Sequence, residues 1–187
     1  MLKTAGFILA GGRSTRMGSD KAALEIGGLT LLEQVARHAA AAAGPVTIIG
    51  PADRYGGAGW PVIADRRSGR GPLAGIETAL ELRAAEWNLI VAVDMPGLRA
   101  EFLARILGAA IESQADCLLP VSPSGYPEPL CAVYHSRCLA AVSAALDRDQ
   151  NKITAALEGL QVLHFPIHNQ ESVTNVNTPE DWARYRG

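Results

Sequence analysis

Residues 6–24 read GFILAGGRSTRMGSDKAAL, an apolar run that changes abruptly into a loop rich in glycine and positive charge. The run itself, residues 6–10, is typical of a short buried strand. The loop after it has three interpretations: the end of a signal peptide, a surface turn, or an anion-binding loop. The apolar run is only about as long as the shortest signal-peptide cores, so we interpret it as the first core strand.

Similar apolar runs alternate with helical patterns along the rest of the chain. Near-continuous hydrophobic runs, typical of strands covered on both faces, occupy residues 6–10, 45–50, 61–65, 89–94, 116–121, 131–135 and 160–167. Apolar residues at helical spacing predict helices at 29–43, 72–86, 100–113 and, after an N-cap at Thr178, within 177–186. This alternation predicts an α/β fold with a mostly parallel sheet and helices on both faces, in a single domain of residues 1–187.

The composition excludes several classes of protein. Of the 187 residues 48% are hydrophobic and 19% charged, as in a globular protein, and the net charge of −2 provides no overall basic field for nucleic acid or membranes. The three cysteines, Cys117, Cys131 and Cys138, form no CxxC pair, which disfavours a disulfide scaffold or a zinc site. We expect a soluble, cytoplasmic protein that binds neither nucleic acid nor membrane, with Cys117 buried.

The loop after the first strand combines backbone freedom with positive charge. Gly11 and Gly12 allow the backbone to approach a ligand closely, and Arg13, Arg16 and Lys21 supply compensating charge for an anion. The spacing is neither that of a Walker A loop nor that of a GxGxxG dinucleotide motif. A phosphate-binding loop is the interpretation that we favour over a glycine turn with solvated cations.

Two carboxylates end later strands, where ligands of parallel α/β sheets bind. Asp94 ends the run LIVAVD, and a carboxylate there either holds Mg²⁺ beside substrate phosphates or caps the turn that follows. Asp65 ends PVIAD, and it either accepts hydrogen bonds from a nucleotide or belongs to a solvated turn. For the neighbouring Arg66, Arg67 and Arg70 individually, we expect solvated side chains.

The segment TNVNTPED, residues 174–181, places two asparagines two residues apart. In an extended segment such residues point to the same side, so Asn175 and Asn177 could offer amide oxygens to a metal or ligand. A turn with a helix cap explains Thr178, Pro179 and Asp181 but leaves Asn175 without a role.

The motifs LAGGRSTRMGSDK, GPLAGIETAL, AVDMPGL and NVNTPED occur in this order and together span nearly the whole chain. In this the sequence resembles the molybdenum cofactor guanylyltransferase family, within the larger nucleotidyltransferase group. The resemblance implies a Rossmann-like three-layer α/β/α fold and Mg²⁺-dependent transfer of GMP from GTP to the phosphate of molybdopterin, with release of pyrophosphate. It also implies contacts with molybdenum cofactor biosynthesis proteins and with the proteins that accept the cofactor.

The resemblance further implies roles for individual residues. The nucleotide site would be lined by Leu9, Ala10, Gly11 and Gly12. Arg16 and Lys21 would lie on the triphosphate.

At the later strand ends, the same resemblance implies that Asp65 contacts the nucleotide and that Asp94 binds Mg²⁺. Asn175 and Asn177 would lie near the metal and the acceptor phosphate. Family members often carry an asparagine at the end of the second strand, where it contacts guanosine. This chain has Gly50 and Pro51 there instead.

Two other activities fit the same motifs. The first is a related nucleotidyltransferase that uses CTP on molybdopterin or a nucleoside triphosphate on a sugar phosphate. The second is a non-catalytic nucleotide-binding adaptor, against which the presence of both Lys21 and Asp94 speaks.

Overall fold

The computed structural model describes residues 2–11, 20–167 and 173–186. Within them, seven strands form one sheet in the order β5-β4-β1-β6-β8-β7-β9. Their bounds are β1 Leu2–Leu9, β4 Val46–Ile49, β5 Val62–Ile63, β6 Ala85–Ala92, β7 Cys117–Val121, β8 Cys131–His135 and β9 Val162–Pro166. Only β8 pairs antiparallel with its neighbours β6 and β7, and the other pairs of this sheet are parallel. The predicted mostly parallel sheet is confirmed.

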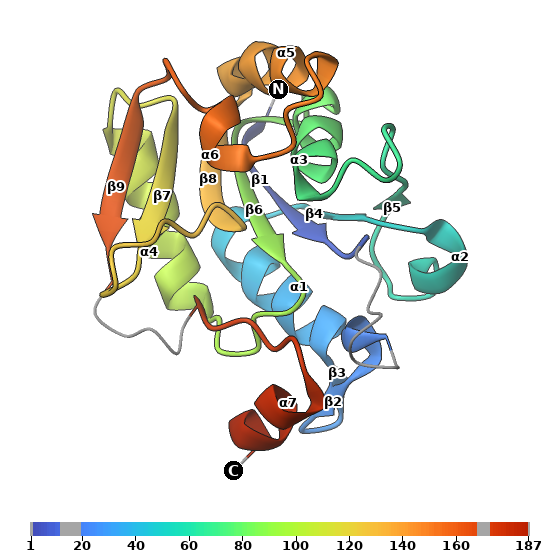
Figure 1. Ribbon diagram of the computed structural model, residues 1–187. Helices are drawn as coiled ribbons and strands as arrows, with labels where there is room; N and C mark the ends of the chain where they lie inside the picture. Colours follow the sequence, from blue (N-terminus) through green and yellow to red (C-terminus); the bar gives the residue numbers. More distant parts are fainter. Residues whose placement is uncertain (1, 12–19, 168–172, 187) are drawn as a thin grey trace.

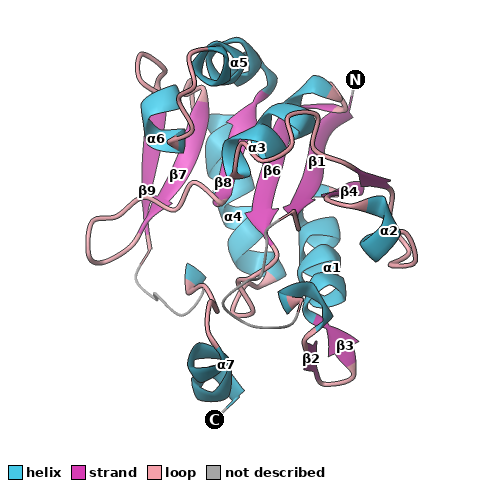
Figure 2. Cartoon of the chain, turned by 45° about the vertical axis from the view of Figure 1, so that its right-hand side comes forward, coloured by secondary structure: helices cyan, strands magenta, loops and turns pink. Residues whose placement is uncertain are grey.

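Helices cover both faces of this sheet, as Figures 1 and 2 show. The helices are α1 Leu31–Ala43, α2 Ala52–Tyr55, α3 Pro72–Glu81, α4 Ala100–Glu112, α5 Leu139–Asp147, α6 Ile153–Ala156 and α7 Pro179–Arg186. Short 3₁₀ turns η1 (Lys21–Ala23) and η2 (Ser136–Cys138) and a small hairpin of β2 (Glu25–Ile26) and β3 (Leu29–Thr30) complete the described chain. None of these helices combines the length and the hydrophobicity that a membrane crossing needs.

The period-2 alternation of strand side chains divides the core into two layers. Leu89 and Val91 of β6 pack with the apolar faces of α1 and α4. Ile90, between them in sequence, packs on the opposite side with α3 and α5. This is the three-layer α/β/α arrangement that the family resemblance implied, and it leaves the ends of the strands open for a site.

Helices α1 and α7 begin with side-chain caps. Thr30 caps α1, its hydroxyl accepting from the Glu33 amide at 3.2 Å while the Glu33 carboxylate accepts from the Thr30 amide at 2.8 Å. At the other end of the chain, the Asp181 amide donates to the Thr178 hydroxyl at 3.1 Å. The predicted N-cap at Thr178 is therefore confirmed.

Some predicted boundaries are wrong. The helix predicted over 72–86 ends at Glu81, because Arg83 adopts a left-handed conformation with φ 47° and Ala85 already begins β6. Ala85, within the predicted helix, belongs to the strand instead and is 0% exposed. The helices α2, α5 and α6 were not predicted, since short or alanine-rich segments carry a weak periodic signal.

Helix α1 approaches the central strand closely at Gly6. A Cβ added there would lie 3.0 Å from Val46 Cγ2 and 3.5 Å from Ala39 Cβ. Both neighbours belong to the buried layer beneath α1. The absence of a side chain at Gly6 therefore lets α1 and β4 pack against β1.

We expect Gly6→Ala to lower the free energy of unfolding by about 1–3 kcal/mol, since extra volume in a packed core costs that much. The matched variant is Gly108→Ala in α4, where an added Cβ meets nothing within 4 Å. It should raise stability by about 0.5–1 kcal/mol through better helix propensity. Urea denaturation of both variants tests this, and equal shifts in the same direction would contradict the packing argument.

Candidate functional site

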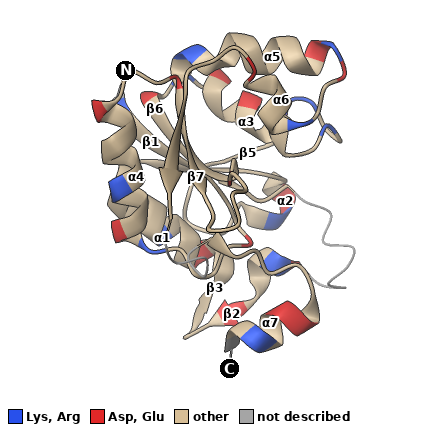
Figure 3. Ribbon diagram, turned by 60° about the vertical axis from the view of Figure 1, so that its left-hand side comes forward, with Lys and Arg blue, Asp and Glu red and all other residues tan. Residues whose placement is uncertain are grey.

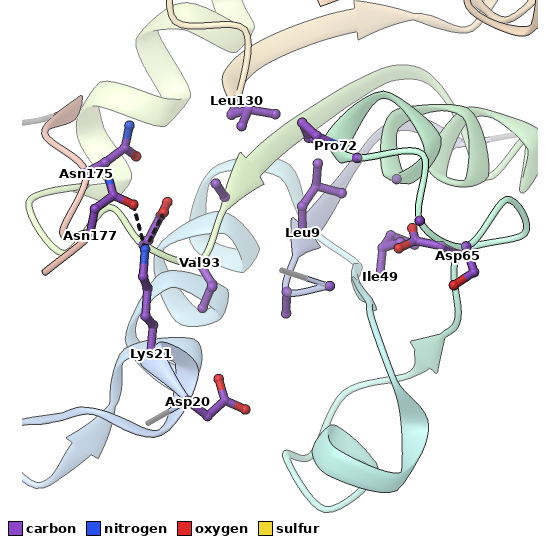
Figure 4. A pocket seen from close by; sticks show the side chains of 18 residues that line it. Leu9, Asp20, Lys21, Ile49, Asp65, Pro72, Val93, Leu130, Asn175 and Asn177 are labelled. Carbon is purple, nitrogen blue, oxygen red and sulfur yellow. Dashed lines mark hydrogen bonds and ion pairs between the residues drawn. The ribbon is translucent and has the colours of Figure 1, made fainter. Parts of the chain in front are cut away.

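A cavity of about 990 Å³ opens at the carboxyl end of the central strands. Its lining includes eight residues that the sequence singled out: Leu9, Ala10, Gly11, Lys21, Asp65, Asp94, Asn175 and Asn177. Figure 4 shows how the labelled side chains of this set surround one space. Gly12 and Arg16, together with Arg13, lie outside the described residues. The structure thus brings into one cavity all the predicted site residues that it describes.

The parallel strands explain why residues so far apart in sequence meet. The backbone ladder continues past the strand ends, with the Ala10 amide donating to Ile49 O at 2.8 Å and the Val93 amide donating to Leu9 O at 3.1 Å. The Val176 amide donates to Asp94 O at 2.8 Å, which attaches the segment near the carboxyl terminus to the same edge.

Lys21 connects two of these segments. Its ammonium donates to Asn177 Oδ1 at 2.6 Å and lies 3.4 Å from Asp94 Oδ2. The Lys21 side chain is only 14% exposed and that of Asp94 23%. Among the described residues, the Asp94 carboxylate therefore lies beside a cation in the cavity. This favours the prediction that Asp94 is a residue of the site over the alternative that it caps the following turn.

Asn175 lies beside this cluster with an unsatisfied oxygen. Its Oδ1 is buried and has no hydrogen-bond partner among the described residues. Both Asn175 and Asn177 line the cavity, as the extended spacing predicted. A buried amide oxygen without a donor costs free energy unless a ligand satisfies it.

The donor atoms here suit a hard cation. Carboxylate and amide oxygens, as on Asp94 and Asn175, are the protein ligands that Mg²⁺ prefers. No three His, Cys, Asp or Glu side chains within the described ranges gather as a protein-only metal site would require. An ion at this position would therefore complete its coordination with other oxygen ligands, such as water or substrate phosphates.

Asp65 occupies another part of the lining. Its Oδ1 is buried without a partner among the described residues, and burial raises the pKa of its carboxyl group. A Cβ added at Gly11 would lie 2.8 Å from Asp65 Oδ2, and one added at Gly75 would lie 3.4 Å from Oδ1. Gly11, in the loop after β1, and Gly75, on α3, thus make room for a carboxylate that can accept hydrogen bonds from a ligand.

The three arginines after Asp65 all have ion-pair partners. Arg66 is solvated as expected, with 64% of its side chain exposed, whereas Arg67 and Arg70 are 36% and 29% exposed and are held by their partners. Arg66 pairs with Glu81 at 3.1 Å. Arg67 pairs with Glu77 at 2.8 Å, and Glu77 is a carboxylate on α3 that is 1% exposed. A buried carboxylate needs such a counter-ion.

Arg67 and Arg70 also reach the end of α5. Arg67 donates to Asp147 Oδ1 at 2.7 Å, while Arg70 donates to Leu146 O at 2.8 Å and pairs with Asp149. Figure 3 shows acidic and basic positions near one another around α3 and α5. These contacts hold the loop that carries Ser68 and Gly69, two further lining residues of the cavity.

Sequence reasoning missed several lining residues. Asp20, Ser68 and Gly69 belong to the cavity. Asp20 lies within the motif LAGGRSTRMGSDK, whereas Ser68 and Gly69 lie in none of the motifs. Gly71 and Pro72 also line it, and the motif GPLAGIETAL contains both.

The fold and this cavity define a nucleotide-binding α/β protein of the nucleotidyltransferase type. A model described as "MobA-like NTP transferase domain" matches residues 6–162. A probable molybdenum cofactor guanylyltransferase of Deinococcus radiodurans is 34% identical over 187 residues, which cover 100% of this chain and 96% of the relative. One from Carboxydothermus hydrogenoformans is 34% identical over 184 residues, covering 95% of this chain and 92% of the relative.

Solved structures agree with these relatives. Molybdopterin-guanine dinucleotide biosynthesis protein A from Archaeoglobus fulgidus superposes with a TM-score of 0.82 at 26% identity, covering 96% of this chain and 95% of that one. A CMP:2-keto-3-deoxy-manno-octonic acid synthetase, solved with CTP, shares the fold with a TM-score of 0.78 at 13% identity. The chain belongs to the family of MobA-like NTP transferase domains.

The buried Asp65 carboxyl, whose Oδ1 has no partner among the described residues, gives a pH-dependent prediction. Its pKa is raised in the folded state, so the folded chain holds the proton more tightly, and stability is lost as the pH rises through the raised pKa. Asp65→Asn should therefore raise the melting temperature at pH 7 and raise it less at pH 4. Thermal melts at the two pH values measure this, with Asp53→Asn at an exposed position of α2 as the control. A gain that is the same at both pH values would contradict it.

Proposed function

We propose that the protein transfers GMP from GTP to the phosphate of molybdopterin, releasing pyrophosphate and forming the molybdopterin guanine dinucleotide. The observation that carries this proposal is the cluster of Lys21, Asp94 and Asn177 in the cavity, with contacts of 2.6 and 3.4 Å. The names of the relatives from Deinococcus radiodurans and Archaeoglobus fulgidus support it.

Lys21 is suited to the charge changes of this reaction. Attack of a phosphate oxygen on the α-phosphorus of GTP develops negative charge on the bridging and leaving oxygens. A preorganised ammonium stabilises that charge more in the transition state than in the ground state. Asp94 and Asn177 restrain Lys21 at the cavity wall, so little reorganisation is needed when the phosphates bind.

Asp94 and Asn175 are the residues that would hold Mg²⁺. When bound, the ion would neutralise phosphate charge and polarise the phosphoryl oxygens. The buried Oδ1 of Asn175 has no partner within the described ranges, and this supports the assignment because a bound Mg²⁺ would satisfy that oxygen.

The acceptor phosphate needs no protein base. Its second pKa is about 6, so near pH 7 it is already largely ionised. Positioning and charge stabilisation are then sufficient for catalysis, and the described lining of the cavity supplies a cation, carboxylates and amides for these roles.

Asp65 is our candidate for a nucleotide contact. Its carboxylate lines the cavity without a partner for Oδ1 among the described residues, so it can accept from N–H or O–H groups of the base or ribose.

We also place the reaction in the cytoplasm, a reducing compartment that suits the free cysteines of the described chain.

The defining experiment is turnover of molybdopterin with GTP, CTP or ATP in the presence of Mg²⁺, measured as pyrophosphate release. We expect GTP to be used best. A preference for CTP would replace guanine with cytosine in the proposal. GTP binding without pyrophosphate release from authentic acceptor would favour a non-catalytic adaptor instead.

Two substitutions test the proposed roles at the site. Asp94→Ala and Lys21→Ala should each lower kcat/KM at least about 100-fold, since each removes charge stabilisation that acts in the transition state. Lys152→Ala and Glu158→Ala, at exposed positions around α6, are matched controls and should retain wild-type activity. Circular dichroism should show folded protein in all four. Full activity of Asp94→Ala would contradict the proposed role of Asp94 as a metal ligand.

A further inference from the structure

We propose that Tyr55 is a positioning residue for the proposed nucleotidyl transfer: its hydroxyl restrains the Asp20 carboxylate so that the adjacent Lys21 stays available to the substrate phosphates. This inference rests on the proposed function. Tyr55 belongs to α2 and is not itself among the cavity-lining residues.

The contact that suggests this role joins α2 to η1. The Tyr55 hydroxyl lies 2.9 Å from Asp20 Oδ2 and 3.1 Å from Oδ1, and it donates to this carboxylate. Asp20 Oδ1 also accepts from the Ala22 amide at 3.1 Å, which caps η1. One carboxylate thus shapes the turn that begins with Lys21 and anchors it to α2.

Tyr55 is itself held rigidly. It is 6% exposed, and a Cβ added at Gly50 would lie 3.2 Å from both Cδ2 and Cε2 of its ring. Gly50 stands after β4, where the family resemblance would place an asparagine. In this chain the space beside Gly50 is filled by the tyrosine ring. Burial raises the pKa of the Tyr55 phenol, and Asp20 raises it further, so the hydroxyl keeps its proton at neutral pH.

Asp20 needs such a restraint because of where it lies. Asp20 and Lys21 are adjacent in sequence and both line the cavity. Figure 4 shows Lys21 extending toward Asn177 while Asp20 leaves the turn in another direction. A free carboxylate at this position could pair with the Lys21 ammonium or repel the phosphates of a bound nucleotide. The hydrogen bond from the Tyr55 hydroxyl holds the carboxylate in the direction seen here, so that it does not turn toward the Lys21 ammonium.

The first test is kinetic. Tyr55→Phe keeps the ring against Gly50 and removes only the hydroxyl, so kcat/KM for GTP should fall about tenfold, as misplacement of a binding group by a fraction of an ångström does. Tyr126→Phe, at a tyrosine 71% exposed, is the matched control and should not change activity. Melting temperatures show whether a loss of activity comes from unfolding.

A double-mutant cycle separates positioning from packing. Asp20→Asn keeps a side chain able to cap η1 but removes the charge. In that background, adding Tyr55→Phe should change kcat/KM less than about twofold, since there is no carboxylate left to restrain. An equal loss in both backgrounds, or no loss in the wild-type background, would overturn the inference.

The same double-mutant cycle can be measured by calorimetry as binding of inorganic triphosphate to the wild type, Tyr55→Phe, Asp20→Asn and the double variant. This probe tests the phosphate site alone, because it has neither a nucleotide base nor the acceptor. We expect Tyr55→Phe to weaken triphosphate binding about tenfold only when Asp20 is present. If the wild-type chain transfers no GMP but this pattern holds, the proposed function fails and the positioning role stands. If GMP transfer occurs and binding shows no coupling, only the positioning role fails. A wild-type chain that binds no triphosphate would overturn the positioning role, and the GMP-transfer assay alone decides the proposed function.

Discussion

Hydrogen bonding between β1 and β6 is the constraint on which the rest of the molecule depends. The two strands pair in parallel from Leu2 opposite Ala85 to Leu9 opposite Ala92. Because they end at the same edge, the loop after Leu9 and the carboxylate of Asp94 must face one space. The carboxyl-terminal segment joins them through the backbone of Asp94 and Val176. A cavity at this edge therefore follows from strand pairing before any side chain is considered.

Buried and half-buried polar side chains in this protein differ in whether their atoms have hydrogen-bond or ion-pair partners. Arg67 and Arg70 are tied to carboxylates and a carbonyl of α3 and α5, and they stabilise a loop. In contrast, Asp65 and Asn175 keep buried oxygens without partners among the described residues, and both face the cavity. Glu77 Oε1, outside the cavity lining, is also buried without a partner among the described residues. Unsatisfied polar atoms cost stability, so it is the combination of such an atom with a place in the cavity lining, where a ligand could pair with it, that marks Asp65 and Asn175 as candidate binding residues.

Sequence reasoning succeeded where the signal is local. Apolar runs predicted the sheet strands, and Thr178 with Asp181 predicted the cap of α7. It failed at the end of α3, because the helical pattern over 72–86 continues into residues that the sheet recruits for β6. Pairing with β1 outweighs the helical preference of Ala84 to Glu86, and a local pattern contains no record of that pairing.

The sequence by itself determined which chemistry is present: glycine and cations after the first strand, carboxylates at later strand ends, and two asparagines at extended spacing. It also carried the motifs by which the family is recognised. Only the tertiary structure decided which charges meet. Arg67 donates a hydrogen bond to Asp147, 80 residues later in the chain, and Tyr55 donates one to Asp20, 35 residues earlier. Such contacts depend on the order of strands in the sheet and on how helices pack over them, and these are properties of the whole chain rather than of any segment.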